Sequence, residues 1–412
     1  MNIKFYENIS EDGRKMIRPE PLSPGDQAAL IAPSFHTSRK KLDDAVRSVE
    51  MLGLVPVVFP SCISKYDYLA GEDNLRAEDV MKAFSDPLIR AVFCLRGGYG
   101  AARILDLIDY EVIRKNPKVF VGFSDITALH TAINQRCGLI TYHGPMPTAS
   151  YHSLDKEISL ASLNHWLFDK QPVHEIQWKE AKILNRGRIQ KINCGTEKLI
   201  HNAARCLDDR RKCDGANDVI EMHTGHSAGK AGAEDARAVM HERVPGAARI
   251  CAGQPDRKTG AEDARAVMHE HILGAARVCA GQPDRKTGAL MSGRLCGGNL
   301  TVLAAALGTP YEIETAGKIL FLEDVGERTY RIDRTVTALR LAGRLQACSG
   351  ILLGTFEGCT PDPGGRTCEQ IIREIAEPFG IPVLSRLPCG HSKPNMTLPL
   401  GAWCEIFEDQ ES

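Results

Sequence analysis

The stretch VFVGFSDIT at residues 119–127 decides the fold. It reads as a short apolar strand that ends in a glycine and a serine and leads at once into a helix over 125–136, which is typical of a buried parallel strand in an α/β sheet. Outward from it, strand and helix patterns alternate. The other expected strands are 26–32, 54–59, 88–95 and 138–142, and the other expected helices are 38–53, 74–84 and 101–108. This alternation predicts a doubly wound parallel sheet over about residues 20–150.

The pattern after residue 290 is more mixed. Strands are expected at 318–322, at 349–356 and, interrupted by Pro399 and Gly401, at 396–407, and helices are expected at 332–342 and 368–376. These patterns predict a smaller, β-rich C-terminal domain. The expected organisation is an N-terminal tail at 1–19, an α/β nucleophile domain at 20–165, and a C-terminal domain at 166–185 and 290–408.

Residues 186–289 differ in composition from the rest of the chain, because they contain no Phe, Trp or Tyr. Within them, residues 232–259 and 260–287 form a tandem repeat whose two copies match at 24 of 28 positions. Each copy offers few large apolar side chains, too few to offset the conformational entropy that folding removes. We therefore predict a largely disordered insertion at 186–289, and we interpret the repeat as a duplication; a binding module is the alternative.

The overall composition is that of a globular protein, with 43% hydrophobic and 25% charged residues and a formal net charge of −1. This balance gives no electrostatic reason to expect a nucleic acid or a membrane surface as partner. We find neither an apolar run long enough for a membrane helix nor an apolar signal segment in residues 1–20. The expectation is a cytoplasmic protein whose 14 cysteines are reduced thiols.

Ser124 is a candidate nucleophile, because a strand–glycine–serine–helix order exposes a hydroxyl at the end of a strand. The amide of Asp125, at the start of the following helix, would then face a developing oxyanion. The neighbouring turn RGGYG at 96–100 is expected on the same sheet edge, where Gly98 could supply a second donor. The alternative is that Ser124 only caps the helix and that the glycines only form a tight turn.

A serine nucleophile needs a base and an acid that orients the base. His391 is the candidate base, because it lies in a Gly/Pro-rich loop, where functional residues are frequent. Glu323 is the candidate acid, because it follows the expected buried strand at 318–322. Asp324 and Glu327 are rivals for this role, and spacing does not distinguish the three carboxylates.

The sequence predicts neither a metal nor a cofactor. It lacks the H-E-x-x-H pattern and the glycine patterns of nucleotide-binding loops. The insertion does hold cysteines and histidines at irregular spacing, which we do not interpret as a zinc site. They are Cys194, Cys206, Cys213, His201, His223 and His226.

Five motifs, taken together and in this order, resemble the LD-carboxypeptidase family, which comprises muramoyltetrapeptide carboxypeptidases and related microcin C immunity peptidases. They are GGYG at 97–100, VGFSDITALH at 121–130, GGNLTVL at 297–303, LFLEDVGE at 320–327 with YRIDR at 330–334, and GHSKPNMTLPLG at 390–401. The resemblance covers about residues 20–185 and 290–408 and leaves out the insertion.

The resemblance implies a serine peptidase with Ser124 as nucleophile, His391 as base and Glu323 as acid, and with the amides of Gly98 and Asp125 as oxyanion donors. It also implies a class I glutamine-amidotransferase-like N-terminal domain and a homodimer. The implied substrate is cytoplasmic murein tetrapeptide, cleaved at the L,D bond before its terminal D-Ala during peptidoglycan recycling.

Arg96, Arg331 and Arg334 are further candidates for binding a substrate carboxylate, and Tyr99 is a further candidate for contacting the substrate. Each arginine could instead form an ordinary ion pair. Two alternatives to the murein peptidase stay open. One is an immunity peptidase that cleaves peptidyl-adenylate analogues, and the other is a folded scaffold that the insertion has made inactive.

Overall fold

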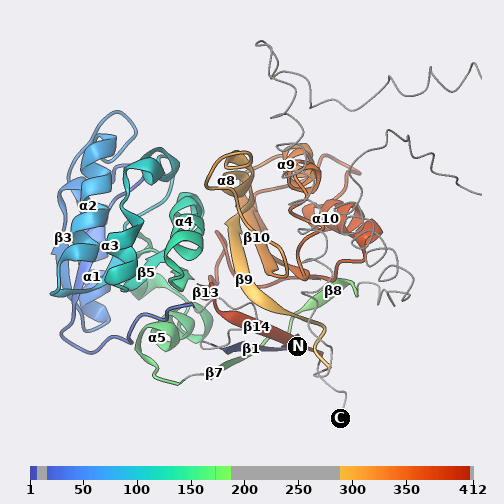
Figure 1. Cartoon of the computed structure of the whole chain (residues 1–412), viewed down its shortest axis with the longest axis horizontal. Coiled ribbons are helices and arrows are strands. Elements are labelled where there is room, and N and C mark those ends of the chain that lie inside the picture. The colour runs from blue at the N-terminus through green and yellow to red at the C-terminus, as the bar shows by residue number, and fades with distance from the viewer. Residues whose placement is uncertain (7–15, 172, 187–287, 409–412) are drawn as a thin grey trace, which may run out of the picture. The chain divides into compact units, whose positions relative to one another are not determined.

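The computed structural model describes residues 1–6, 16–171, 173–186 and 288–408. The insertion expected at 186–289, with its tandem repeat, lies almost wholly outside the described residues. Its expected disorder therefore stays a prediction. The described residues form two β-sheets with helices packed against them (Figure 1).

The first sheet has six strands in the order β13-β6-β5-β4-β2-β3. Their bounds are Gln27–Ile31 (β2), Val55–Val58 (β3), Ile89–Cys94 (β4), Val119–Gly122 (β5), Thr141–His143 (β6) and Leu398–Leu400 (β13). The five strands from the N-terminal part pair in parallel, whereas β13 pairs with β6 antiparallel. The expected parallel sheet is therefore present, and it gains an edge strand from the end of the chain.

Helices cover both faces of the first sheet, because side chains on its central strands alternate between two apolar clusters. Along β2, Ala28 and Leu30 belong to the cluster that includes helix α1 (Arg39–Met51), whereas Ala29 and Ile31 belong to the other. The second face carries α2 (Asp73–Ser85), α3 (Tyr110–Lys115) and α4 (Thr127–Cys137). The helix expected at 101–108 is a 3-10 helix over Ala101–Leu107.

The second sheet has eight strands in the order β7-β1-β14-β9-β10-β11-β12-β8. Their bounds are Asn2–Tyr6 (β1), Val173–Gln177 (β7), Lys182–Asn185 (β8), Met291–Asn299 (β9), Ile319–Val325 (β10), Gly350–Glu357 (β11), Val383–Ser385 (β12) and Trp403–Phe407 (β14). Strands β9 to β12 are parallel, and the outer strands pair antiparallel.

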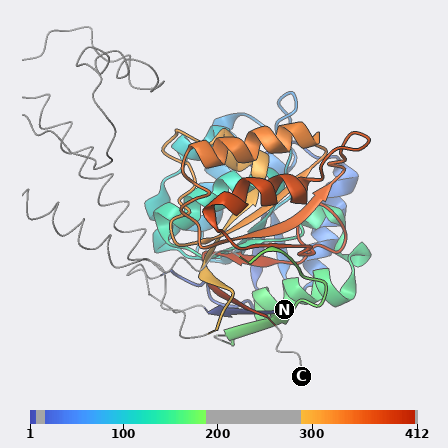
Figure 2. The same ribbon diagram turned by 90° about the vertical axis from the view of Figure 1, so that its right-hand side faces the viewer.

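Three helices cover one face of this second sheet: α8 (Leu300–Ala305), α9 (Thr329–Leu341) and α10 (Cys368–Ala376). Figure 2 shows α9 and α10 side by side over the sheet. Helix α10 has the bounds that the sequence predicts, because Thr367 and Gln370 form a capping box at its start. Helix α5 (Ala161–Phe168) lies between β6 of the first sheet and β7 of the second in the chain, and the expected domain boundary at 165/166 falls within it.

Two segments differ from the sequence-based expectation. Residues 2–6, expected in a tail, form β1 between β7 and β14, with Ile3 and Phe5 fully buried. The single strand expected at 396–407 is two strands, β13 in the first sheet and β14 in the second. The chain changes sheet at Gly401, whose φ of +97° suits glycine.

No helix among the described residues is long and apolar enough to cross a membrane.

We predict that Phe5→Ala lowers the free energy of unfolding by about 3–5 kcal/mol, because it leaves a cavity beside the Trp166 ring, 5.3 Å away. Urea unfolding followed by circular dichroism measures the change. Phe379→Ala is the matched control, since that ring is 37% exposed. Equal losses in the two variants would show that β1 does not belong to the core.

Candidate active site

Ser124 lies just beyond the carboxyl end of β5, the third strand from the β13 edge of the first sheet. Its φ is +65°, a left-handed conformation that costs a residue with a side chain about 1–3 kcal/mol. A short 3-10 turn over Ser124–Ile126 leads into α4. The strained turn directs the Ser124 hydroxyl away from the helix, and no bond from this side chain caps the helix.

The glycine loop, residues 96–100, lies against this turn. A Cβ atom on Gly97 would stand 2.9 Å from Oγ of Ser124 and 3.2 Å from the amide nitrogen of Asp125. A Cβ atom on Gly98, whose φ is +118°, would stand 2.5 Å from the ring of Phe35. Both positions therefore require glycine, and the absence of side chains brings the backbone of the loop close to the hydroxyl.

The side chain of Asp125 joins three loops of the first sheet. Its Oδ2 accepts hydrogen bonds from Oγ of Ser34, at 2.6 Å, and from the amide of Ala101, at 2.8 Å. Burial raises the pKa of the Asp125 carboxyl, while these two hydrogen bonds oppose the rise. This carboxylate thus holds the end of the glycine loop beside Ser124.

His391 lies in the histidine loop, residues 386–397, which connects β12 of the second sheet with β13 of the first. The ring of His391 packs edge-on against Phe123 at 4.9 Å. Gly390, with a φ of +128°, approaches Glu323 so closely that a Cβ atom there would stand 2.9 Å from Oε2. The amide of Gly390 donates to Oδ1 of Asn395, which fixes the turn before His391.

Three side chains from distant parts of the chain form a continuous hydrogen-bonded row. Nε2 of His391 lies 2.9 Å from Oγ of Ser124, and Nδ1 lies 2.7 Å from Oε2 of Glu323. The hydroxyl comes from the first sheet, the carboxylate from β10 of the second, and the imidazole from the loop between them. If Nδ1 carries the proton and donates to Glu323, Nε2 can accept the proton of the hydroxyl.

Glu323 is fully buried, and its Oε1 has no hydrogen-bond partner among the described protein atoms. Burial raises the pKa of its carboxyl above the ordinary value, and the hydrogen bond and charge of His391 lower it only in part. A buried carboxylate beside an imidazole stabilises the imidazolium when that ring takes up a proton.

The two rival carboxylates make other contacts. Asp324 accepts hydrogen bonds from the side chains of Asn299 and Thr301 at the start of α8. Glu327 pairs with Arg331 on α9, at 3.2 Å. The geometry therefore separates the three candidates, and only Glu323 contacts His391 among them.

The candidate substrate-binding residues are divided between two places. Arg96 and Tyr99 belong to the glycine loop, where the Arg96 guanidinium lies 5.6 Å from the Phe35 ring centre and Tyr99 is 48% exposed. Arg331 is engaged with Glu327 and with the ring of Tyr330. Arg96 and Tyr99 thus belong to the loop whose Gly97 approaches Ser124, whereas Arg331 has partners on its own helix and the preceding loop.

Sequence reasoning missed several groups that position the site. It gave the backbone amide of Asp125 a role as oxyanion donor but gave its side chain no role, and it overlooked Ser34 and Thr127. The hydroxyl of Thr127 accepts from the amide of Asn299 at 3.0 Å, and so joins α4 to the end of β9. The motif at 121–130 contains both Asp125 and Thr127, but the partners that define their roles lie far away in the chain.

Comparison with known proteins gives consistent matches. The LD-carboxypeptidase N-terminal domain family matches residues 28–144, and the LD-carboxypeptidase C-terminal domain family matches residues 292–406. A probable murein peptide carboxypeptidase of Bacillus subtilis is 31% identical over 93% of this chain and 90% of its own length. The microcin C7 self-immunity protein MccF of Escherichia coli is 24% identical over 95% of this chain and 93% of its own.

The fold of this chain is also similar to that of proteins whose structures have been solved. The crystal structure of a muramoyltetrapeptide carboxypeptidase from Oxalobacter formigenes superposes with a TM-score of 0.58 at 20% identity, and covers 93% of this chain and 99% of that one. At this identity the match concerns the fold. It agrees with the parallel first sheet and the separate β-rich second domain described above.

We predict that Glu323→Gln gains stability relative to the unmodified protein as the pH rises above about 4.5, the ordinary pKa of the carboxyl. In the folded protein this pKa is raised, so between the two values only the folded state holds the proton. The unfolding free energy of the unmodified protein therefore falls across this window, and glutamine removes that loss.

Urea unfolding at a series of pH values from about 4.5 to 8 measures the difference. Glu327→Gln is the matched control, because that side chain is 24% exposed and pairs with Arg331 at the surface. A pH slope that is identical in the unmodified and Glu323→Gln proteins would contradict the raised pKa.

Proposed function

The chain belongs to the LD-carboxypeptidase family and is a carboxypeptidase, and on this basis we propose that it hydrolyses the L,D peptide bond before the terminal D-Ala of murein tetrapeptide. The observation that carries the proposal is the row Ser124–His391–Glu323, with separations of 2.9 and 2.7 Å. The name of the Bacillus subtilis relative supports murein peptides as the substrate class.

In the proposed mechanism, Nε2 of His391 takes the proton of Ser124 as Oγ attacks the carbonyl carbon on the L side of the scissile bond. Glu323 holds the ring in the required tautomer and stabilises the imidazolium. His391 then passes the proton to the nitrogen of the departing D-Ala. Water, activated by the same imidazole, hydrolyses the resulting acyl-enzyme and restores the Ser124 hydroxyl.

The backbone amides of Gly98 and Asp125 are the proposed oxyanion donors. Support comes from the close approach of the glycine loop to both Oγ of Ser124 and the amide of Asp125. Each donor of this kind contributes on the order of 10²–10³ to turnover in other serine hydrolases. The buried Asp125 carboxylate accepts a hydrogen bond from the amide of Ala101, and this bond would hold the glycine loop, and so the amide of Gly98, beside the amide of Asp125.

Arg96 and Tyr99 are the proposed contacts to the substrate, because they extend from the loop beside Ser124. A guanidinium there would bind the terminal carboxylate that a carboxypeptidase must recognise. Arg331 is a weaker candidate, since Glu327 already neutralises its charge. The proposal also includes action in the cytoplasm, inferred from the sequence, and a homodimer, which the resemblance to the family implies.

A second candidate function is cleavage of peptidyl-adenylate analogues, and the likeness to the microcin C7 self-immunity protein supports it. The same Ser124 chemistry would serve both substrates, so the distinction lies in what the site accepts. Parallel incubation with murein tetrapeptide and with an aminoacyl sulfamoyl adenosine would distinguish the two functions by the product released. If D-Ala alone is released, the result supports the first proposal; if the adenylate analogue alone is cleaved, it supports the second.

We predict that Ser124→Ala lowers kcat on murein tetrapeptide by a factor of about 10⁶, because the nucleophile and its base act as a unit. Released D-Ala measures the rate, and the tetrapeptide ending in L-Ala serves as the substrate control. Ser85→Ala, at the exposed end of α2, is the matched protein control. Near-normal turnover by Ser124→Ala would reject this residue as the nucleophile.

We further predict that a chain with residues 187–287 replaced by a short Gly/Ser linker folds and keeps its activity. The two ends of the segment both adjoin the end of β14: Arg186 pairs with Glu408 at 2.5 Å, and the amide of Leu290 donates to the carbonyl of Ile406 at 2.7 Å. A short linker can therefore join them, and it also lowers the entropic cost of closing the loop.

The comparison of full and shortened chains also tests the inactive scaffold. Activity in both forms supports the prediction. Activity in the shortened chain only would mean that the segment blocks the site. A shortened chain that folds, as circular dichroism reports, but has lost an activity present in the full chain would contradict the prediction.

A further inference from the structure

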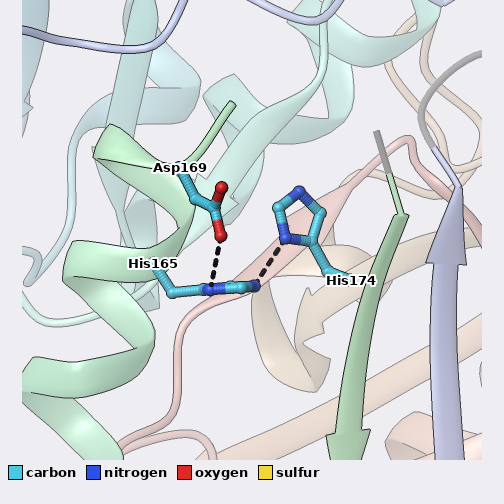
Figure 3. Close-up of side chains that lie close together, drawn as sticks. All are labelled: His165, Asp169 and His174. Carbon is cyan, nitrogen blue, oxygen red and sulfur yellow. Dashed lines mark hydrogen bonds and ion pairs between the residues drawn. The ribbon is translucent and has the colours of Figure 1, made fainter. Parts of the chain in front are cut away.

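Two histidines and an aspartate gather outside the candidate active site, where the end of α5 faces β7 (Figure 3). His165 and Asp169 lie one helical turn apart, and Asp169 is the residue that ends α5. His174 comes from the neighbouring strand β7. We call these three residues the α5–β7 cluster. In the described part of the chain it is the one group of this kind suited to a metal ion.

The three side chains are already in contact. Nδ1 of His165 lies 3.3 Å from Oδ2 of Asp169, and Nε2 of His165 lies 2.5 Å from Nδ1 of His174. One ligand atom from each residue lies within 4.8 Å of the others. Figure 3 shows the His165 ring between the carboxylate and the second imidazole.

Burial and charge in the cluster suit a cation. His174 is 1% exposed and packs on the ring of Trp166 at 4.5 Å, whereas the side chains of His165 and Asp169 are 36% and 32% exposed. An ion can therefore enter from the solvent side and meet a fixed histidine. The carboxylate of Asp169 adds an anionic oxygen ligand to the two imidazoles.

The carboxylate oxygens of Asp169 face different partners. Arg18 donates to the backbone carbonyls of Asp169 and Gln171, at 2.5 and 3.1 Å. Oδ1 of Asp169 accepts from the amide of Gln171, so Oδ2 is the oxygen directed at the histidine.

We propose that the α5–β7 cluster binds a divalent transition-metal ion such as Zn²⁺, with one nitrogen from each of His165 and His174, one oxygen from Asp169, and water as the fourth ligand. Zinc takes such nitrogen and oxygen ligands at about 2.0–2.2 Å in a tetrahedron, which separates neighbouring ligand atoms by about 3.3 Å. With Nδ1 of His165 as its ligand atom, the 3.3 Å separation from Oδ2 of Asp169 matches this value, and one ligand atom from each of the three residues lies within 4.8 Å of the others. Small rotations of the two partly exposed side chains would complete the site.

The ion has a structural role, because the cluster is connected to the histidine loop through α5. Trp166, next to His165, donates from Nε1 to the carbonyl of Thr397 at 2.9 Å. The amide of Thr397 donates to Oγ of Ser162 on the same helix, at 3.0 Å. An ion that fixes α5 to β7 therefore stabilises the support of the loop that carries His391, and takes no part in the reaction.

The test compares zinc bound to the full-length protein and to Asp169→Asn, after incubation with Zn²⁺ and removal of unbound metal by gel filtration. Asparagine keeps the shape of the side chain, so folding is preserved, and it removes the anionic ligand. We expect the unmodified protein to retain one more zinc ion per chain than the variant. The difference is the informative quantity, because residues 187–287 carry six further histidines that are the same in both proteins.

His165→Gln provides an independent variant, and His152→Ala, at an exposed position on a 3-10 turn, provides the matched histidine control. We expect zinc to raise the midpoint of thermal unfolding of the unmodified and His152→Ala proteins, and to lose this effect in His165→Gln and Asp169→Asn. Equal zinc content and equal thermal shifts in all four proteins would overturn the proposal.

Discussion

The site depends on one topological constraint, the return of the chain from the second sheet to the first. After β12 at one side of the second sheet, the chain crosses to pair β13 with β6, and then goes back as β14 between β1 and β9. Because both ends of the histidine loop are anchored on different sheets, this loop must bridge them. His391 can therefore reach a hydroxyl on one sheet and a carboxylate on the other at the same time.

This arrangement lowers the free energy of unfolding, and the destabilising features are at the candidate catalytic residues themselves. Glu323 is fully buried with one oxygen unpaired within the described protein, and Ser124 holds a left-handed backbone. A buried carboxylate loses hydration that one hydrogen bond from His391 does not fully replace. The apolar clusters that pack against the two sheets supply the compensating stability.

Local patterns in the sequence predicted the alternating elements of the first sheet, because buried strands and amphipathic helices each have a characteristic spacing of apolar residues. They also selected Ser124 and His391 as candidates, since glycine-flanked turns are visible locally. Spacing alone did not separate Glu323 from Asp324, because the choice depends on which carboxylate a loop 68 residues away approaches. The pairing of residues 2–6 with the last strand was missed for the same reason: contacts of this separation leave no local signal.

Strand direction separates the candidate catalytic residues from the point at which the insertion joins the second sheet. β9 and β10 are parallel, and Asn299 at the end of β9 pairs with Glu323. The segment 187–287 joins the chain before the other end of β9, at Met291, which is eight residues or about 26 Å from that pair along an extended strand. The carboxyl ends of the strands thus carry the reacting groups, and the amino end of β9 receives the insertion. A long insertion can enter there without passing through the elements that hold Ser124, Glu323 and His391 together.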